Sequence, residues 1–133
     1  MATLPGGQNI LLVDDEVDVA QTLEMIFRAR GYKVRMAHSA EEAIETIAGW
    51  EPELAIVDVM LPQMNGIELR EVLRANYPNC QVVLMSGHPA TVDLVQSTRR
   101  DGQPLAEVLM KPLHPAQILE MVAALLPGVA GEA

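Results

Sequence analysis

The residues Leu54-Ala55-Ile56-Val57-Asp58 decide the fold of this 133-residue chain. Four apolar residues in succession, two of them β-branched, predict a strand that is buried on both faces of a sheet. The strand then ends on a carboxylate. In an open α/β sheet, ligands bind at the edge formed by the carboxyl ends of the strands. Asp58 is therefore a candidate functional residue, with the alternative that it only begins a turn or caps a helix.

Similar apolar segments alternate with helical patterns along the rest of the chain. The expected strands are residues 9–13, 33–37, 54–58, 81–85 and 105–110. The expected helices follow the acids at 14–16, the Ser39 cap, the Asn65-Gly66 turn, Pro89 and Pro115. The helix at 89–100 has a thin apolar stripe, which indicates a mobile element. Alternation of this kind predicts a single α/β domain that consists of a parallel sheet with helices on both faces.

The composition excludes several classes of function. The formal net charge is −9, and no run of Lys or Arg offers a footprint for nucleic acid or for an anionic membrane surface. Cys80 is the single cysteine, so an internal disulfide is excluded and a small buried residue is expected. The chain shows no signal peptide and no segment long enough to span a bilayer, which predicts a cytoplasmic protein. Residues 1–8 are expected to be a flexible lead-in and residues 127–133 a flexible tail.

Polar side chains end four of the five expected strands: Asp14-Asp15, Asp58, Ser86 and Lys111. The carboxyl ends of parallel strands lie at one edge of a sheet, so these groups should share a small site. Carboxylates held close together raise each other's pKa, and a hard divalent cation would relieve their repulsion. A ligand set of oxygens, without a nearby His or a second Cys, favours Mg²⁺ over zinc.

These motifs resemble the receiver domain of two-component response regulators. The resemblance extends from about Asn9 to Leu126 and is carried by Asp14-Asp15, Asp58 with the loop Met60-Leu61-Pro62…Gly66, Ser86-Gly87 and Lys111-Pro112. It implies a flavodoxin-like (βα)5 receiver domain over residues 9–126, with a five-stranded parallel sheet of order 2-1-3-4-5. The long link between Ser86 and Lys111 resembles receivers that are attached to hybrid sensor kinases.

The resemblance implies a phosphorelay function centred on Asp58. Asp58 would be the phosphoacceptor, which takes a phosphoryl group from the phosphohistidine of a sensor histidine kinase or phosphotransfer protein. The Mg²⁺ cofactor would be held by Asp15, Asp58 and the backbone carbonyl of Met60. Asp14 would act on the metal through water. The phosphorylated form would then bind a downstream protein that the sequence does not identify, and the family often dimerises through the fourth helix.

The remaining matched residues would stabilise the phosphoryl group or report its presence. Lys111, Ser86 and Gly87 would contact the phosphoryl oxygens. The peptide bond before Pro112 would be cis. Ser86 would also act as a switch, together with a residue three positions before the lysine. That residue is often aromatic in the family and is Val108 here, so an aromatic rotamer switch is not available.

Four further polar residues are considered for the site, and only His88 is given a possible role. His88, two residues after Ser86, is either a modulator of phosphoryl lifetime or an exposed loop histidine. Glu16 is interpreted as a solvated acid in the first helical turn, without a chemical role. His38 and His114 are likewise assigned no function.

The leading hypothesis is a phosphoacceptor signalling module that is not an enzyme, apart from taking up and losing its own phosphoryl group. One alternative is a Mg²⁺-dependent phosphatase with an aspartyl nucleophile. Such enzymes generally carry a second Asp two residues after the nucleophile, where this chain has Met60. The other alternative is a receiver-like interaction module that is never phosphorylated, although all five key residues of the family are present here.

Overall fold

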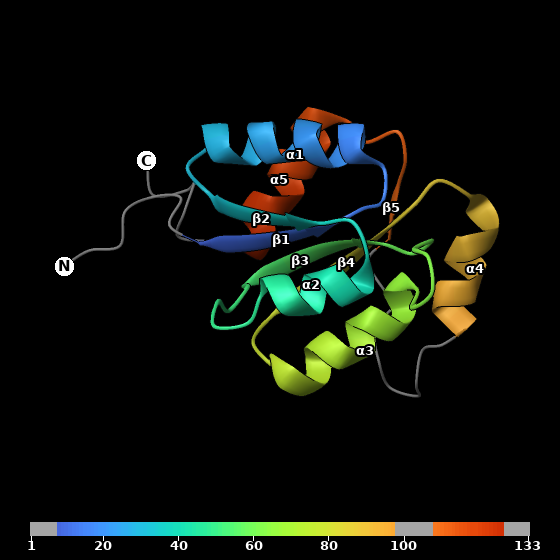
Figure 1. Ribbon diagram of the computed structural model, residues 1–133. Coiled ribbons are helices and arrows are strands. Elements are labelled where there is room, and N and C mark those ends of the chain that lie inside the picture. Colours follow the sequence, from blue (N-terminus) through green and yellow to red (C-terminus); the bar gives the residue numbers. More distant parts are fainter. Residues whose placement is uncertain (1–7, 98–107, 127–133) are drawn as a thin grey trace.

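The computed structural model describes residues 8–97 and 108–126 of the chain. Within these ranges, five strands and five helices alternate along the chain (Figure 1). The strands are β1 (Asn9–Val13), β2 (Lys33–Ala37), β3 (Leu54–Asp58), β4 (Gln81–Ser86) and β5 (Val108–Met110). The helices are α1 (Val17–Ala29), α2 (Ala40–Thr46), α3 (Gly66–Asn76), α4 (Pro89–Ser97) and α5 (Pro115–Leu125). The predicted alternation is therefore confirmed.

The strands form one parallel sheet of order β2-β1-β3-β4-β5, which is the order that the family resemblance implied. Strand β3 lies at the centre, because Leu54 pairs with Ile10 on one side and with Gln81 on the other. All five residues of β3 are buried. The apolar run that decided the fold prediction thus forms the central strand, and Asp58 ends it.

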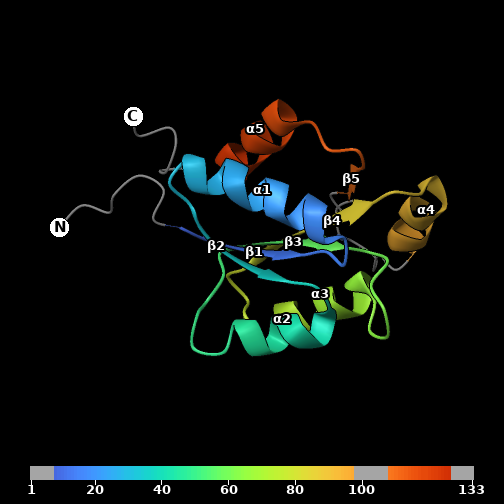
Figure 2. The same ribbon diagram turned by 45° about the horizontal axis from the view of Figure 1, so that its top comes forward.

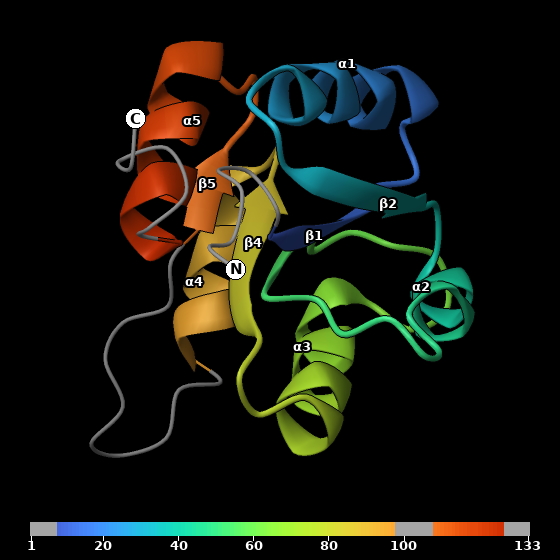
Figure 3. The same ribbon diagram turned by 90° about the vertical axis from the view of Figure 1, so that its left-hand side faces the viewer.

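Alternate residues of the central strands enter two separate cores, because side chains of a strand point to opposite faces. Leu11, Val13, Ala55 and Val57 belong to the core that includes residues of α2 and α3. Ile10, Leu12, Leu54 and Ile56 belong to the core that includes residues of α1 and α5. Figures 2 and 3 show these two helix pairs on opposite faces of the sheet, with α4 standing apart from both pairs.

Local sequence signals set the helix boundaries. The Ser39 hydroxyl accepts a hydrogen bond from the Glu42 N–H at 3.0 Å, which caps α2 as the sequence predicted. Asn65 and Glu68 form a reciprocal capping box at the start of α3. Pro115 is the first residue of α5. The capping box at Asn65 thus ends the loop that follows Asp58, and Pro115 ends the loop that follows Lys111.

Some expectations fall partly outside the described ranges. Strand β5 begins at Val108 in the structure, and residues 105–107 of the expected strand are not among those described. The same holds for residues 98–100 of the expected fourth helix and for the flexible segments predicted at 1–7 and 127–133. Gln8, predicted within the lead-in, donates a hydrogen bond to Glu53 Oε2 at 3.2 Å. None of the helices in the described ranges is long and apolar enough to cross a membrane.

Candidate functional site

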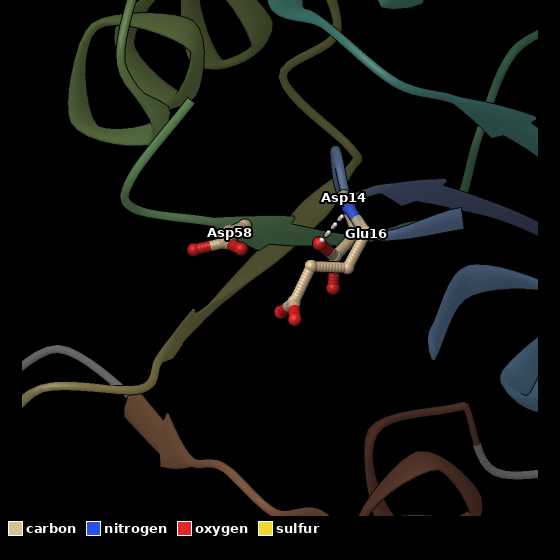
Figure 4. Close-up of side chains that lie close together, drawn as sticks. All are labelled: Asp14, Glu16 and Asp58. Atoms are coloured by element: carbon tan, nitrogen blue, oxygen red, sulfur yellow. Dashed lines mark hydrogen bonds between the residues drawn. The ribbon is translucent and has the colours of Figure 1, made fainter. Parts of the chain in front are cut away.

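Three acidic side chains meet at the carboxyl edge of the sheet (Figure 4). Asp14 follows β1, Glu16 lies just before α1, and Asp58 ends β3. One carboxylate oxygen from each residue lies within 4.8 Å of the others. Asp14 and Asp58 are buried, whereas Glu16 is exposed. A set of carboxylate oxygens this close fits a hard divalent cation such as Mg²⁺.

The ammonium of Lys111 lies among the same three carboxylates. Its Nζ is 2.9 Å from Asp14 Oδ2, 2.6 Å from Glu16 Oε1 and 2.8 Å from Asp58 Oδ2. Burial disfavours this charge, but hydrogen bonds to Asp58 and Glu16 and the ion pair with Asp14 outweigh burial and raise the pKa of Lys111. Lys111 is therefore a permanent positive charge beside Asp58.

The pKa of Asp14 is raised from its ordinary value. Burial is the largest cause, and the negative charge of Asp58 adds to it. The ion pair with Lys111 and the hydrogen bond from the Glu16 N–H act in the opposite direction without cancelling the shift. A bound cation would stabilise the ionised form of this buried carboxylate, as the sequence analysis expected for closely spaced acids.

Both oxygens of Asp58 have a partner. Oδ1 accepts a hydrogen bond from the Met60 N–H at 3.0 Å, and Oδ2 contacts Lys111. The loop after β3 is held tightly against the strand end, because the Gly66 N–H donates to the Val59 carbonyl at 2.9 Å. Gly66 also lies directly against the Asp58 backbone, where a Cβ would overlap the carbonyl oxygen. The contacts with Met60 and Lys111 fix the orientation of the Asp58 carboxylate, and those with Gly66 fix the backbone that carries it.

Ser86 and Gly87 lie beside this group at the end of β4. Ser86 is buried, and its hydroxyl donates to the His88 carbonyl at 2.7 Å and accepts from the His88 N–H at 3.0 Å. A Cβ on Gly87 would meet the Lys111 side chain at 3.9 Å, so Gly87 flanks the lysine. The peptide bond between Lys111 and Pro112 is cis, as the family resemblance implied.

The structure gives less support to three other predicted site residues. Asp15 is exposed, and the group of acids found within the described residues contains Glu16 instead. Met60 is 61% exposed, and the role of its carbonyl as a metal ligand stays a prediction. Val108 is half-buried and packs against the core beneath α2 and α3. Its role in a switch also stays a prediction.

The sequence analysis missed Glu16, to which it assigned no chemical role. The carboxylate of Glu16 contacts Lys111, which lies 95 positions later in the chain. The available signal was a third consecutive acid at a strand end that already carried two. That signal alone does not separate a solvated acid in a first helical turn from one that turns back into the site.

Comparisons with known sequences agree with this geometry. The sequence profile of the response regulator receiver domain matches residues 10–123. The DNA-binding response regulator MtrA of Mycobacterium tuberculosis is 31% identical over 119 residues, which cover 90% of this chain and 50% of MtrA. The nitrogen assimilation regulatory protein NtrX of Azorhizobium caulinodans is 32% identical over 103 residues, which cover 76% of this chain and 23% of NtrX. The chain thus spans half or less of the length of these relatives.

Solved structures show the same similarity over whole domains. A CheY-like response regulator receiver domain protein from Methanospirillum hungatei superposes with a TM-score of 0.78 at 26% identity, covering 98% of this chain and 100% of that one. The receiver domain of NtrX from Brucella abortus gives a TM-score of 0.77 at 27% identity, covering 90% and 98%.

Proposed function

Because this chain belongs to the receiver-domain family of two-component response regulators, we propose that Asp58 is its phosphoacceptor. The phosphoryl donor would be the phosphohistidine of a sensor histidine kinase or phosphotransfer protein. The observation that carries the proposal is the contact of Asp58 Oδ2 with Lys111 Nζ at 2.8 Å, beside the buried Asp14. A nucleophilic carboxylate thus lies next to a fixed positive charge at the end of the central strand.

The reaction needs few chemical groups. A carboxylate oxygen of Asp58 forms a bond to phosphorus while the N–P bond of the phosphohistidine breaks, and the imidazole leaves with the electron pair. Negative charge on the transferring oxygens must be balanced by cationic groups, of which Lys111 is one. The Ser86 hydroxyl would turn from the His88 carbonyl to donate to a phosphoryl oxygen.

The acidic side chains would hold the metal ion. We propose Mg²⁺, with Asp58, the Met60 carbonyl and Asp15 as ligands and Asp14 acting through water, and we add Glu16 because its carboxylate lies in the group. Mg²⁺ would supply the positive charge that the phosphoryl oxygens need beyond that of Lys111.

We further propose that the module has no turnover of external phosphate esters. The position two residues after Asp58 is Met60, whose side chain has no acid or base to protonate a leaving group. Phosphorylation would instead alter a surface that a downstream protein binds. With a net charge of −9, direct binding of this chain to DNA is disfavoured. We propose a cytoplasmic location, because the sensor histidine kinase that would supply the phosphoryl group draws on ATP.

The proposal is tested by phosphorylation with acetyl phosphate, a small phosphodonor. Intact-mass spectrometry should show one added phosphoryl group in the presence of Mg²⁺ and none in EDTA. Asp58→Asn should abolish the addition, because an amide is not a nucleophile of this kind. Asp18→Asn is the matched control and should be labelled like the wild type, because Asp18 is an exposed residue of α1. Equal labelling of Asp58→Asn and wild type would contradict the assignment.

A further inference from the structure

His38 contacts the backbone of the acidic site from the turn between β2 and α2. Strands β1 and β2 pair in parallel up to Val13 and Ala37, and the Asp14 N–H extends the ladder by donating to the Ala37 carbonyl at 3.1 Å. One step further, a parallel ladder would use the Ser39 N–H as donor to the Asp14 carbonyl. The chain instead turns at Ser39 to begin α2. His38 Nδ1 lies 3.0 Å from the Asp14 carbonyl oxygen.

The chemistry of this contact fixes the direction of the hydrogen bond. A carbonyl oxygen only accepts, so Nδ1 of His38 carries the hydrogen and donates it. The ring thereby supplies the donor that the ladder would have supplied. A buried backbone carbonyl without a partner is unfavourable, so the bond stabilises this conformation of Asp14.

His38 is itself anchored to the first turn of α2. Its backbone N–H donates to Glu42 Oε1 at 2.7 Å, and the Glu42 N–H donates to the Ser39 hydroxyl at 3.0 Å. The ring therefore projects from a capped helix start, which limits the freedom of the His38 backbone. A rigid base makes the ring a suitable support for another segment.

The Asp14 carboxylate connects the backbone that His38 holds to the other residues of the acidic site. Its Oδ1 accepts a hydrogen bond from the Glu16 N–H at 2.9 Å, and its Oδ2 lies 2.9 Å from Lys111 Nζ (Figure 4 shows the Asp14–Glu16 bond). Rotation of the Asp14 peptide would therefore displace the carboxylate of Asp14 and the backbone of Glu16 together. Both residues belong to the group of acids at the sheet edge.

We propose that His38 is a positioning residue for the cation site. Its Nδ1–H fixes the Asp14 carbonyl, and with it the carboxylates of Asp14 and Glu16, in the arrangement that binds a divalent cation. The inference rests on the proposed function only in requiring that this site binds Mg²⁺. In metal sites, hydrogen bonds that orient the ligands commonly contribute a factor of about ten or more to metal affinity.

The test measures the dissociation constant for Mg²⁺ by isothermal titration calorimetry on the full chain. His38→Leu has a side chain of similar size but no hydrogen-bond donor, and it should weaken Mg²⁺ binding about tenfold. His38→Asn places an amide N–H near the position of Nδ1 and should restore affinity close to the wild-type value. His114→Leu is the matched control and should bind as the wild type does, because His114 is the N-cap of α5 and makes no side-chain cap hydrogen bond.

The outcomes separate this inference from the proposed function. If the wild type binds Mg²⁺ and takes up phosphate, but His38→Leu binds Mg²⁺ equally well, the role of His38 is wrong and the proposed function stands. Equal weakening in His38→Leu and His38→Asn also overturns the inference, because the donor would then not matter. A wild type that binds no Mg²⁺ overturns the cation site itself. Should His38→Leu fail to fold, His38→Gln replaces it, because its amide lies one methylene too far out.

Discussion

At the scale of the residue, Lys111 is held by partners that differ in burial. The side chain of Glu16 is 60% exposed, whereas those of Asp14 and Asp58 are 1% and 6% exposed. An exposed ion pair contributes less than about 1 kcal/mol, because water screens it. Removing one partner of a buried pair costs roughly 3 kcal/mol, because it leaves a buried charge uncompensated. The free energy that Lys111 contributes should therefore come mainly from the two aspartates.

This asymmetry predicts different losses of stability in two variants. In EDTA, Glu16→Gln should lower the free energy of unfolding by less than about 1 kcal/mol. Lys111→Met should lower it by roughly 3 kcal/mol, because Asp14 and Asp58 then lose their cation. Urea denaturation monitored by the fluorescence of Trp50, the single tryptophan, measures both values. Equal losses in the two variants would show that burial of the aspartates does not govern this group.

The sequence predicted the site residues that end apolar strands and missed those that reach it from turns. Asp58, Ser86 and Lys111 were predictable, because a polar residue after a buried strand must lie at the sheet edge. Glu16 lies three residues after β1 and His38 follows β2 directly, but the contacts of both side chains depend on the exact course of a turn and on side-chain rotamers. No periodicity in the sequence encodes those features, so both residues were assigned no role.

At the scale of the element, the loop between β3 and α3 is fixed by the close approach of Gly66 to Asp58. A Cβ at position 66 would overlap the Asp58 carbonyl oxygen and lie 2.9 Å from the Asp58 carbonyl carbon and from Val59 Cα. All three are backbone atoms, so no change of rotamer relieves the overlap. The start of α3 would have to move away from the strand that carries the phosphoacceptor.

Gly66→Ala should therefore lower the free energy of unfolding by about 2–3 kcal/mol, the upper part of the range seen when a packed site is overfilled. It should also weaken Mg²⁺ binding, because the displaced loop begins at Asp58. Gly49→Ala is the matched control: a Cβ there meets nothing within 4 Å, and the cost arises only from its φ of +73°. Denaturation in EDTA and calorimetry with Mg²⁺ test both effects. A Gly66→Ala protein with the stability and Mg²⁺ affinity of the Gly49→Ala control would contradict this account.

The sequence predicted a strand most clearly where the strand is buried on both faces and has a neighbour on each side. Strand β3, with a neighbour on each side and a core on each face, was visible as an uninterrupted apolar run. Strand β5 lies at the edge of the sheet, and none of its three described residues is fully buried. An edge strand needs less apolar sequence than a central one, so its beginning is poorly marked. The cap at Ser39 and the start of α5 at Pro115 were local signals and were predicted correctly, and the predicted turn at Asn65-Gly66 carries a capping box at the start of α3.

At the scale of the whole molecule, stability depends on how the excess negative charge is balanced. The chain has a net charge of −9, and its buried acids gather at one edge of the sheet. A carboxyl whose pKa is higher in the folded than in the unfolded state destabilises the fold when it is ionised, because the folded state binds the proton more tightly. Burial places Asp14 in this class. Its unfavourable contribution is present in full above its raised pKa and disappears as the pH falls towards the ordinary value of 3.8.

Asp14→Asn should therefore raise the melting temperature of the metal-free protein at neutral pH, and the difference from wild type should shrink as the pH falls. The amide oxygen can still accept the hydrogen bond from the Glu16 N–H, and Lys111 keeps Glu16 and Asp58 as partners. Mg²⁺ should reverse the order: a concentration about 100 times the dissociation constant stabilises the wild type by about 2.7 kcal/mol, and the variant should gain less. Differential scanning calorimetry in EDTA and in Mg²⁺ measures both effects. A wild-type melting temperature that millimolar Mg²⁺ leaves unchanged would rule out the cation site, whereas a less stable Asp14→Asn in EDTA would show that the ion pair with Lys111 outweighs burial.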